Sequence, residues 1–222
     1  MPPLEINMKH VILAVAAAVA LAAAGCSNPS RSRDIANPNV SALTLAQQVC
    51  SNCHGVTGVS TSPIFPHLAA QTPAYIESQL REFRSHDRSD PAGFEYMWGL
   101  SRGFTDAQIA GLADYYSHQA PARTAPLSNA GWIAAGEKIF KEGVADKNVP
   151  PCMACHGAAG QGNEAFPRLA GQHMDYVVKQ LVVFQRSDER PKGAIMKTVA
   201  HELSPDDIRN AAAYVQSLAG DH

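Results

Sequence analysis

The stretch Cys152-Met153-Ala154-Cys155-His156 has an equivalent earlier in the chain, Cys50-Ser51-Asn52-Cys53-His54, and together they decide the fold. Each is a C-x-x-C-H sequence, the attachment pattern of a c-type haem. Two cysteines three positions apart on a tight turn can both bond to one flat macrocycle, and the histidine that follows then lies beneath its iron. We therefore predict two covalently attached haem c groups. Their thioether bonds are assigned to Cys50, Cys53, Cys152 and Cys155, and one axial iron ligand each to His54 and His156.

Two other interpretations of these cysteines compete with haem attachment. A C-x-x-C sequence can be a redox-active dithiol, but that interpretation expects a βαβ context, and no strand-like alternation lies near either motif. Two such pairs can also form a four-thiolate zinc site. The pairs lie 102 positions apart, whereas zinc sites of this type usually separate their pairs by roughly 15 to 20 residues. Zinc also leaves the histidine after each pair unexplained.

Length and composition fit a folded protein with one large or two small domains. The chain has 222 residues, of which 45% are hydrophobic and 17% charged, as is typical of globular proteins. Its net charge of −2 gives no electrostatic basis for binding nucleic acid. Four of the five cysteines belong to the two motifs, which leaves only Cys26 without an assignment.

Residues 1–26 have the pattern of an export signal. A basic flank precedes an apolar run from Val11 to Ala24, which is too short to span a bilayer comfortably. The run ends in a sequence that resembles a bacterial lipoprotein box, apart from Ala23 where leucine is usual. We predict that Cys26 is acylated after cleavage and anchors the protein to a membrane. The alternative is cleavage after an A-x-A sequence, which would leave Cys26 as a free thiol.

The residues after the two motifs also repeat, which indicates a duplicated module. Phe65-Pro66-His67-Leu68-Ala69-Ala70-Gln71 aligns with Phe166-Pro167-Arg168-Leu169-Ala170-Gly171-Gln172. Further matching pairs are Tyr75 and Tyr176, Gln79 and Gln180, Phe83 and Phe184, Met97 and Met196, and Tyr115 and Tyr214. We therefore predict a flexible tether at 27–40, a first domain at 41–120, a linker at 121–130 and a second domain at 131–220.

Both modules show helical patterns at the same places, so the predicted fold class is all-α. Helices are expected at Ala42 to Val49 and Trp132 to Phe140, and after Thr72-Pro73, where a cap and a proline precede an apolar face. Thr105-Asp106-Ala107-Gln108 has the pattern of a capping box, and Ser204-Pro205-Asp206-Asp207 caps the corresponding later helix. Each module is thus expected to be a small helical fold around its covalent haem.

The residue opposite each histidine determines whether the iron carries electrons or meets a substrate. Met97 aligns with Met196, and the two lie 43 and 40 residues after their histidines. A methionine sulfur raises the haem potential and fills the sixth position, so no site is left open for oxygen or peroxide. We predict both as iron ligands, with a place in the core as the alternative. The remaining histidines lack a histidine partner in the other copy, which disfavours bis-histidine ligation.

Pro66 and Pro167 occupy matching positions after the two motifs. A ligating histidine usually donates its second ring N–H to an acceptor that fixes the ring, and a proline carbonyl in a rigid turn would suit this role. We predict that both carbonyls accept such a hydrogen bond. The alternative is a turn that only leads into the next helix.

Through the two motifs, the Phe-Pro-x-Leu-Ala-(Ala/Gly)-Gln segments, the paired methionines and the closing helices, residues 41–218 resemble the dihaem cytochromes c of the cytochrome c4 family. The resemblance implies two class I cytochrome c domains facing each other across a pseudo-two-fold axis, each with His/Met-ligated iron. It also implies a periplasmic, commonly membrane-associated protein that carries electrons from a bc1 complex or another donor to a terminal oxidase or reductase. The sequence departs from the pattern at Ala70 and in the expected anchor at Cys26.

On this interpretation the chain is an electron carrier and not an enzyme, with redox proteins as partners and no small-molecule substrate. A dedicated cytochrome subunit of a dehydrogenase, such as a flavocytochrome, is the first alternative. The second is an enzyme, either a dihaem peroxidase or a thiosulfate dehydrogenase. It expects an iron that is open, bis-histidine or cysteine-ligated, yet only Cys26 remains outside the motifs.

Overall fold

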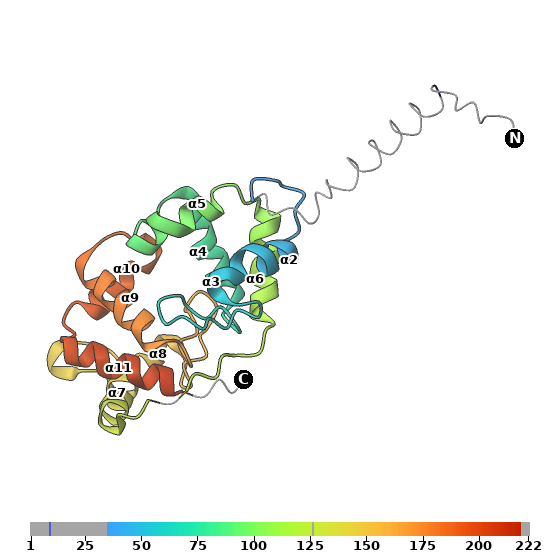
Figure 1. Cartoon of the computed structure of the whole chain (residues 1–222). Coiled ribbons are helices and arrows are strands. Elements are labelled where there is room, and N and C mark those ends of the chain that lie inside the picture. Colours follow the sequence, from blue (N-terminus) through green and yellow to red (C-terminus); the bar gives the residue numbers. More distant parts are fainter. Residues whose placement is uncertain (1–8, 10–34, 126, 219–222) are drawn as a thin grey trace, which may run out of the picture.

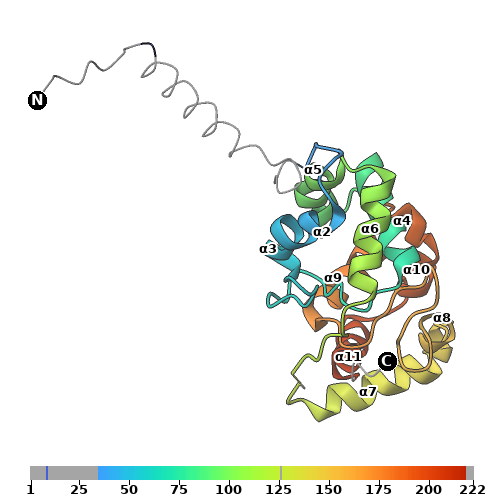
Figure 2. The ribbon, with the colours of Figure 1, turned by 90° about the vertical axis from the view of Figure 1, so that its right-hand side faces the viewer.

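The computed structural model describes residue 9, residues 35–125 and residues 127–218, and it is built from helices (Figure 1). Within these ranges no β-strand forms, and the only β-type pairings are two isolated bridges, Val144 with Val149 and Asn163 with Phe166. The two modules lie side by side, with the blue and green first module above the yellow to red second module (Figures 1 and 2). The predicted all-α fold class is confirmed.

The predicted lipidation site Cys26 lies outside the described residues, as does the predicted signal apart from residue 9. Among the helices that the structure describes, none is both long and apolar enough to cross a membrane. Residues 35–40, from the end of the predicted tether, lie against the first module. Val40 is 1% exposed in its core, and Gln108 donates from its side chain to the carbonyls of Asn37 and Val40. The packed chain therefore begins before Ser41.

The first module folds around a single apolar core. Its helices are α2 (Ala42–Leu45), α3 (Ser51–His54), α4 (Pro73–Ser85), α5 (Trp98–Ser101) and α6 (Asp106–Ser117), with π-helical turns η2 (Ala46–Cys50) and η3 (Gly93–Met97). Because α2, η2 and α3 follow one another directly, the helix expected before the first motif continues through it to His54. Core residues include Leu45, Ile76, Leu80, Ile109, Leu112 and Tyr116.

The second module repeats this order of helices. They are α7 (Ala130–Glu142), α8 (Met153–His156), α9 (Met174–Arg186), α10 (Ala194–Ala200) and α11 (Pro205–Ser217), with 3-10 turns η4 (Ala145–Lys147) and η5 (Pro191–Gly193). The closing helices pack alike in the two modules, α6 against α2 and α4, and α11 against α7 and α9. At the α7–α11 crossing, a Cβ on Gly136 would collide with the backbone of Asn210.

Local side chains explain where the two closing helices begin. The Thr105 hydroxyl accepts from the Gln108 N–H at 3.1 Å, and the Gln108 side chain accepts from the Thr105 N–H at 2.9 Å. Ser204 and Asp207 make the same reciprocal pair at 3.2 and 2.9 Å. Both predicted caps are therefore present, and the second is also a complete capping box, with aspartate in place of the usual longer side chain.

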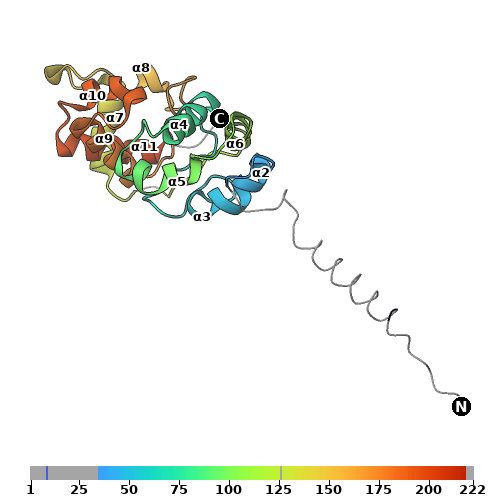
Figure 3. The ribbon, with the colours of Figure 1, turned by 90° about the horizontal axis from the view of Figure 1, so that it is seen from above.

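The two modules face each other (Figure 3), and the hydrogen bonds between them come from α4, α9 and the segments before and after these helices. The Ser89 N–H donates to the Glu189 carbonyl at 2.9 Å, and the Lys192 N–H donates to the Glu82 carboxylate at 3.0 Å. The connecting segment also takes part, because the Thr124 hydroxyl donates to the Gly171 carbonyl at 2.5 Å. The two modules are thus joined by direct hydrogen bonds as well as by the chain.

Two buried arginines lie in this interface and make matching contacts. Arg88 lies over the ring of Phe83 and Arg190 over that of Phe184, each with its guanidinium carbon 4.5 Å from the ring centroid. Both guanidinium groups donate to side-chain oxygens of the facing glutamines on α4 and α9. These bonds join Arg88 to Gln79 and Gln180 at 2.6 and 3.3 Å, and Arg190 to Gln79 and Gln180 at 3.0 and 2.5 Å. Buried charge and aromatic stacking therefore recur on both sides of the interface.

Candidate functional site

His54 and His156 are the last residues of α3 and α8, and each is followed by a glycine that turns the chain. Gly55 and Gly157 have φ values of +76° and +85°, which favour glycine. A Cβ at Gly55 would collide with the carbonyl of Val59. The glycine after each motif therefore ends the helix at the histidine.

One hydrogen bond fixes each of these histidine rings. Nδ1 of His54 donates to the Pro66 carbonyl and Nδ1 of His156 to the Pro167 carbonyl, both at 2.9 Å. Because a carbonyl oxygen only accepts, the hydrogen is on Nδ1 and the lone pair on Nε2 is left for a ligand. Burial lowers the pKa of both histidines, so that the rings are neutral, as metal ligation requires. The hydrogen bonds expected from the sequence are present in both modules.

The two cysteines of each motif lie one helical turn apart and form no disulfide. Burial raises the pKa of Cys50 and of Cys152 to about 11. A redox dithiol instead needs a thiol with a lowered pKa. A four-thiolate zinc site needs its ligands gathered at one point, and no three His, Cys, Asp or Glu side chains in the described part of the chain are so grouped. The geometry favours covalent attachment over both alternatives.

Met97 is connected to the first motif by a shared apolar cluster and by contacts between aromatic rings. It is the last residue of η3 and packs half-buried against the same apolar cluster as Cys50. The ring of Phe65 meets that of His54 edge-on at 6.2 Å between centroids, and that of Tyr96, the neighbour of Met97, at 6.4 Å. Phe65 therefore bridges the first histidine and the methionine segment.

Met196 lies in α10, and the core of the second module consists of two apolar clusters. One apolar cluster contains Cys152, and a second contains Met196. Val178 and Leu181 on α9 pack against both clusters. The second module thus has a wall that carries the motif and a wall that carries the methionine, joined along α9. This arrangement fits a flat apolar group held between the two walls.

Large apolar side chains beside both methionines give a second test of fit. Phe94 and Tyr96 are 60% and 54% exposed, and Ile195 is 59% exposed. Exposed apolar groups clustered at a site usually mark a surface that another group covers. The paired thiols, the neutral imidazoles with a fixed tautomer and these apolar walls together fit haem c in each module.

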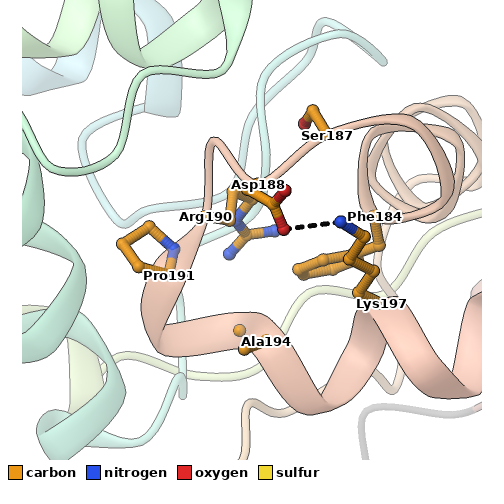
Figure 4. Close-up of a pocket in the computed structure, with 8 residues that line it drawn as sticks. Phe184, Ser187, Asp188, Arg190, Pro191, Ala194 and Lys197 are labelled. Atoms are coloured by element: carbon orange, nitrogen blue, oxygen red, sulfur yellow. Dashed lines mark hydrogen bonds and ion pairs between the residues drawn. The ribbon is translucent and has the colours of Figure 1, made fainter.

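A separate cavity of about 220 Å³ lies between the end of α9 and the start of α10 (Figure 4). Lys197 and Asp188 form an ion pair across it at 2.6 Å, and the ring of Phe184 lies beside that pair. Its lining includes Arg190 but none of the motif residues and not Met196. The cavity is therefore distinct from the group of predicted iron ligands.

The sequence did not predict the residues that connect the two sites. Gln71 and Gln172 recur in the aligned segments, but no role was assigned to them from the sequence. In the structure both are 6% exposed and hydrogen-bonded to the other module. The sequence signal that could have identified them is the recurrence of a glutamine at the same position of both copies.

Comparison with known proteins agrees with this geometry. The family model for cytochrome c matches residues 42–119 and again residues 133–219. Cytochrome c-552 of Acidithiobacillus ferridurans is 39% identical over 174 residues, which cover 76% of this chain and 73% of the relative. Cytochrome c4 of Azotobacter vinelandii is 35% identical over 179 residues, or 77% of this chain and 84% of the relative.

A solved structure and a further relative extend the comparison. The structure of cytochrome c4 from Acidithiobacillus ferrooxidans is 38% identical and superposes with a TM-score of 0.71, covering 76% of this chain and 98% of that one. A protein of Stutzerimonas stutzeri strain A1501, named a thiosulfate dehydrogenase electron acceptor, is 31% identical over 176 residues. The match covers 78% of this chain and 80% of that relative.

Proposed function

Since this chain belongs to the cytochrome c family, and within it to the dihaem cytochromes c4, we propose that it passes single electrons between respiratory proteins in the periplasm. With this membership come two covalently bound haem c groups and a role in electron transfer rather than in enzymatic catalysis. The donor that we propose is a bc1-type complex or a dehydrogenase, and the acceptor a terminal oxidase or reductase.

The observation that carries this proposal is the matching environment of His54 and His156, each fixed by a proline carbonyl at 2.9 Å. Bound haem supplies reversible one-electron chemistry at its iron. In our proposal the four motif cysteines hold the haems, and the Nε2 atoms of the two histidines ligate iron. Pro66 and Pro167 keep the imidazoles in one tautomer and orientation. Such fixed ligands need little rearrangement between the oxidised and the reduced state.

We propose Met97 and Met196 as the sixth ligands. Their support is the alignment of the two residues and the position of each against an apolar wall of its module. A sulfur at this position closes the coordination, so that only electrons, and not oxygen or peroxide, exchange with the iron.

We also propose that Cys26 is acylated and that the chain up to the packed residue Ile35 tethers the two modules to a membrane. The lipoprotein-like sequence before Cys26 supports this. Acylation would keep the carrier near membrane-bound donors and acceptors. Mass spectrometry of the exported protein tests it, because an intact free thiol at Cys26 would contradict the proposal.

The ferric spectrum of the purified holoprotein tests the ligand assignment. We expect a sulfur-to-iron charge-transfer band that accounts for two haems, and loss of about half of it in Met97→Ala and in Met196→Ala. Met174→Ala is the matched control, because Met174 is also half-buried in the second module but is not a proposed ligand. High-spin iron in the unmodified protein, or an unchanged band in both ligand variants, would contradict closed His/Met coordination.

A role as the dedicated electron acceptor of a dehydrogenase is the second candidate. The relative named a thiosulfate dehydrogenase electron acceptor favours it. Stopped-flow reduction separates the two candidates: a bc1-type donor would reduce a general carrier rapidly, whereas an acceptor subunit would be reduced rapidly only by its dehydrogenase. Co-purification with a dehydrogenase or a flavin protein would also favour the second candidate.

A further inference from the structure

Two buried glutamines, one in each module, make the same pair of hydrogen bonds to the backbone of the other module. Gln172 accepts the N–H of His67 on its Oε1 at 2.9 Å and donates from Nε2 to the His67 carbonyl at 3.0 Å. Gln71 accepts the N–H of Arg168 at 2.7 Å and donates to the Arg168 carbonyl at 3.0 Å. Because these residues align in the repeat, the contact is made twice. We refer to Gln71 and Gln172 as the glutamine clamps.

Each clamp is itself held in one orientation by its own module. The Oε1 of Gln71 also accepts the N–H of Thr72, and that of Gln172 the N–H of His173, both at 3.0 Å. A flipped amide would present its NH₂ group to two N–H donors, so the oxygen must face them. The acceptor therefore points at the other module in both cases.

The residue that each clamp holds directly follows the proline that fixes an axial histidine. The peptide group between Pro66 and His67 accepts at its carbonyl from His54 and donates at its N–H to Gln172. The peptide group after Pro167 accepts in the same way from His156 and donates to Gln71. A chain of two hydrogen bonds thus links each iron-ligating histidine to a glutamine of the opposite module.

We propose that each glutamine clamp is a positioning residue for the haem of the other module and lowers its reduction potential. An acceptor on a peptide N–H polarises the peptide and makes its carbonyl a stronger acceptor, especially where both partners are buried. His67 and Arg168, which carry the donating N–H groups, are each 6% exposed. A stronger acceptor on Nδ1 makes the imidazole a more basic ligand, which favours ferric iron. This inference goes beyond the proposed function, since it does not depend on which partners exchange electrons.

Substituting the clamps one at a time gives a crossed prediction. In the holoprotein, Gln172→Leu should raise the potential of the first haem and Gln71→Leu that of the second. An NMR redox titration follows the hyperfine-shifted signals of each module separately. We expect a several-fold change in the reduction equilibrium of the opposite haem, each ten-fold change being 59 mV for one electron. The Nδ1–H resonance of the ferrous histidine should move only in the opposite module.

Two further variants separate this effect from general loosening of the interface. Gln172→Glu keeps an acceptor oxygen for the His67 N–H, loses the donor to the His67 carbonyl and adds negative charge, so it should lower the potential of the first haem or leave it unchanged. Gln180→Met removes another buried interface glutamine, one that contacts Arg88 and Arg190 but neither proline peptide. It should move both Nδ1–H resonances little.

The crossed pattern decides the outcome. Equal shifts of both haems in each leucine variant, or a larger shift in the haem of the substituted module, would overturn the proposal. So would unchanged potentials in a variant whose His67 or Arg168 amide signal shows that the clamp is lost. None of these results would disturb the proposed carrier role, which a variant retains if both haems still cycle between oxidation states.

Discussion

His67 is a buried residue of the interface whose ring nitrogens are both in use. Its Nδ1 accepts the N–H of Ser60 at 3.0 Å, and its Nε2 lies 3.2 Å from the Thr124 hydroxyl. Its ring stacks on that of His173 with centroids 3.9 Å apart. Burial, reinforced by repulsion from His173, lowers the pKa of His67 from 6.5 to about 4. A proton on Nδ1 would break the bond to Ser60.

This pKa shift predicts a loss of stability in acid. Between pH 6.5 and pH 4 the unfolded chain binds a proton at His67 that the folded chain does not, so the free energy of unfolding falls as the pH is lowered. The expected loss from pH 7 to pH 5 is about 2 kcal/mol. Urea unfolding of the holoprotein at both pH values should show a smaller loss for His67→Gln. His118→Gln, at an exposed histidine, should lose as much as the wild type, and an equal loss in His67→Gln would refute the assignment.

The departure from the repeat at Ala70 is explained by its surroundings. Ala70 has a φ of +55° and Gly171 a φ of +76°, and each N–H donates to the closing helix of its module at 3.0 Å. An alanine in this conformation costs roughly 1 to 2 kcal/mol, which the first module tolerates. In the second module a Cβ at Gly171 would meet the Ala122 carbonyl at 2.7 Å, because the connecting segment passes there. Only the first copy has room for the methyl group.

At the scale of helices, both π-helical turns of the first module end at a predicted haem-binding residue. η2 ends at Cys50 and η3 ends at Met97. A π-helical turn accommodates an extra residue without ending a helix, and such turns are frequent at functional sites. Apolar spacing does not reveal them, which is why the helix expected over Ala42 to Val49 in fact continues to His54.

The α7–α11 crossing predicts a strong effect of a single methyl group. Gly136→Ala should lower the free energy of unfolding by about 2 kcal/mol or more, since its Cβ would meet the Asn210 backbone, which cannot move independently of α11. Gly99→Ala in α5 is the matched control, because no atom beyond its chain neighbours and its own helix backbone lies within 4 Å of the added Cβ. That change should be neutral or stabilise by up to about 1 kcal/mol. Thermal or urea unfolding measures both, and similar results would refute this account of the crossing.

At the scale of the whole molecule, buried charge holds the modules together. Arg88 donates from Nε to Asp90 at 2.7 Å, and the two side chains are 4% and 0% exposed. Gln79 donates in turn to Glu82, which also accepts the Lys192 N–H from the second module. The network therefore pairs Arg88 with Asp90 and spans the interface through Glu82 and the Lys192 N–H.

Removing one member of this network should leave a buried charge without compensation. Arg88→Met is expected to lower the free energy of unfolding by about 3 to 5 kcal/mol, because it leaves the fully buried Asp90 without its partner. Arg81→Met removes an exposed arginine that pairs with Glu77 and Asp106 and should cost about 1 kcal/mol or less. Adding Asp90→Asn to Arg88→Met should recover part of the loss. Equal effects of the two arginine variants in urea unfolding would contradict this view of the interface.

The sequence by itself determined the two haem motifs, the duplication, the all-α class and the caps of the two closing helices, whereas Thr72, the cap expected before α4, makes no side-chain capping bond. Each of these depends on residues a few positions apart, as in Cys152 to His156 or Thr105 to Gln108, so the pattern is readable along the chain. Pro66 and Pro167 also lie shortly after their motifs. The general chemistry of ligating histidines predicted that their carbonyls accept a hydrogen bond from the histidine ring, and the structure has both bonds.

Only the tertiary structure decided how the modules face each other. Gln172 and His67 are 105 positions apart, and Gln71 and Arg168 are 97 apart, so their hydrogen bonds depend on the packing of two folded modules. Alignment of the repeat shows that such residues recur but not that each reaches across to the other copy. Pairings of this kind arise from the exclusion of water between two surfaces, for which a linear pattern carries no signal.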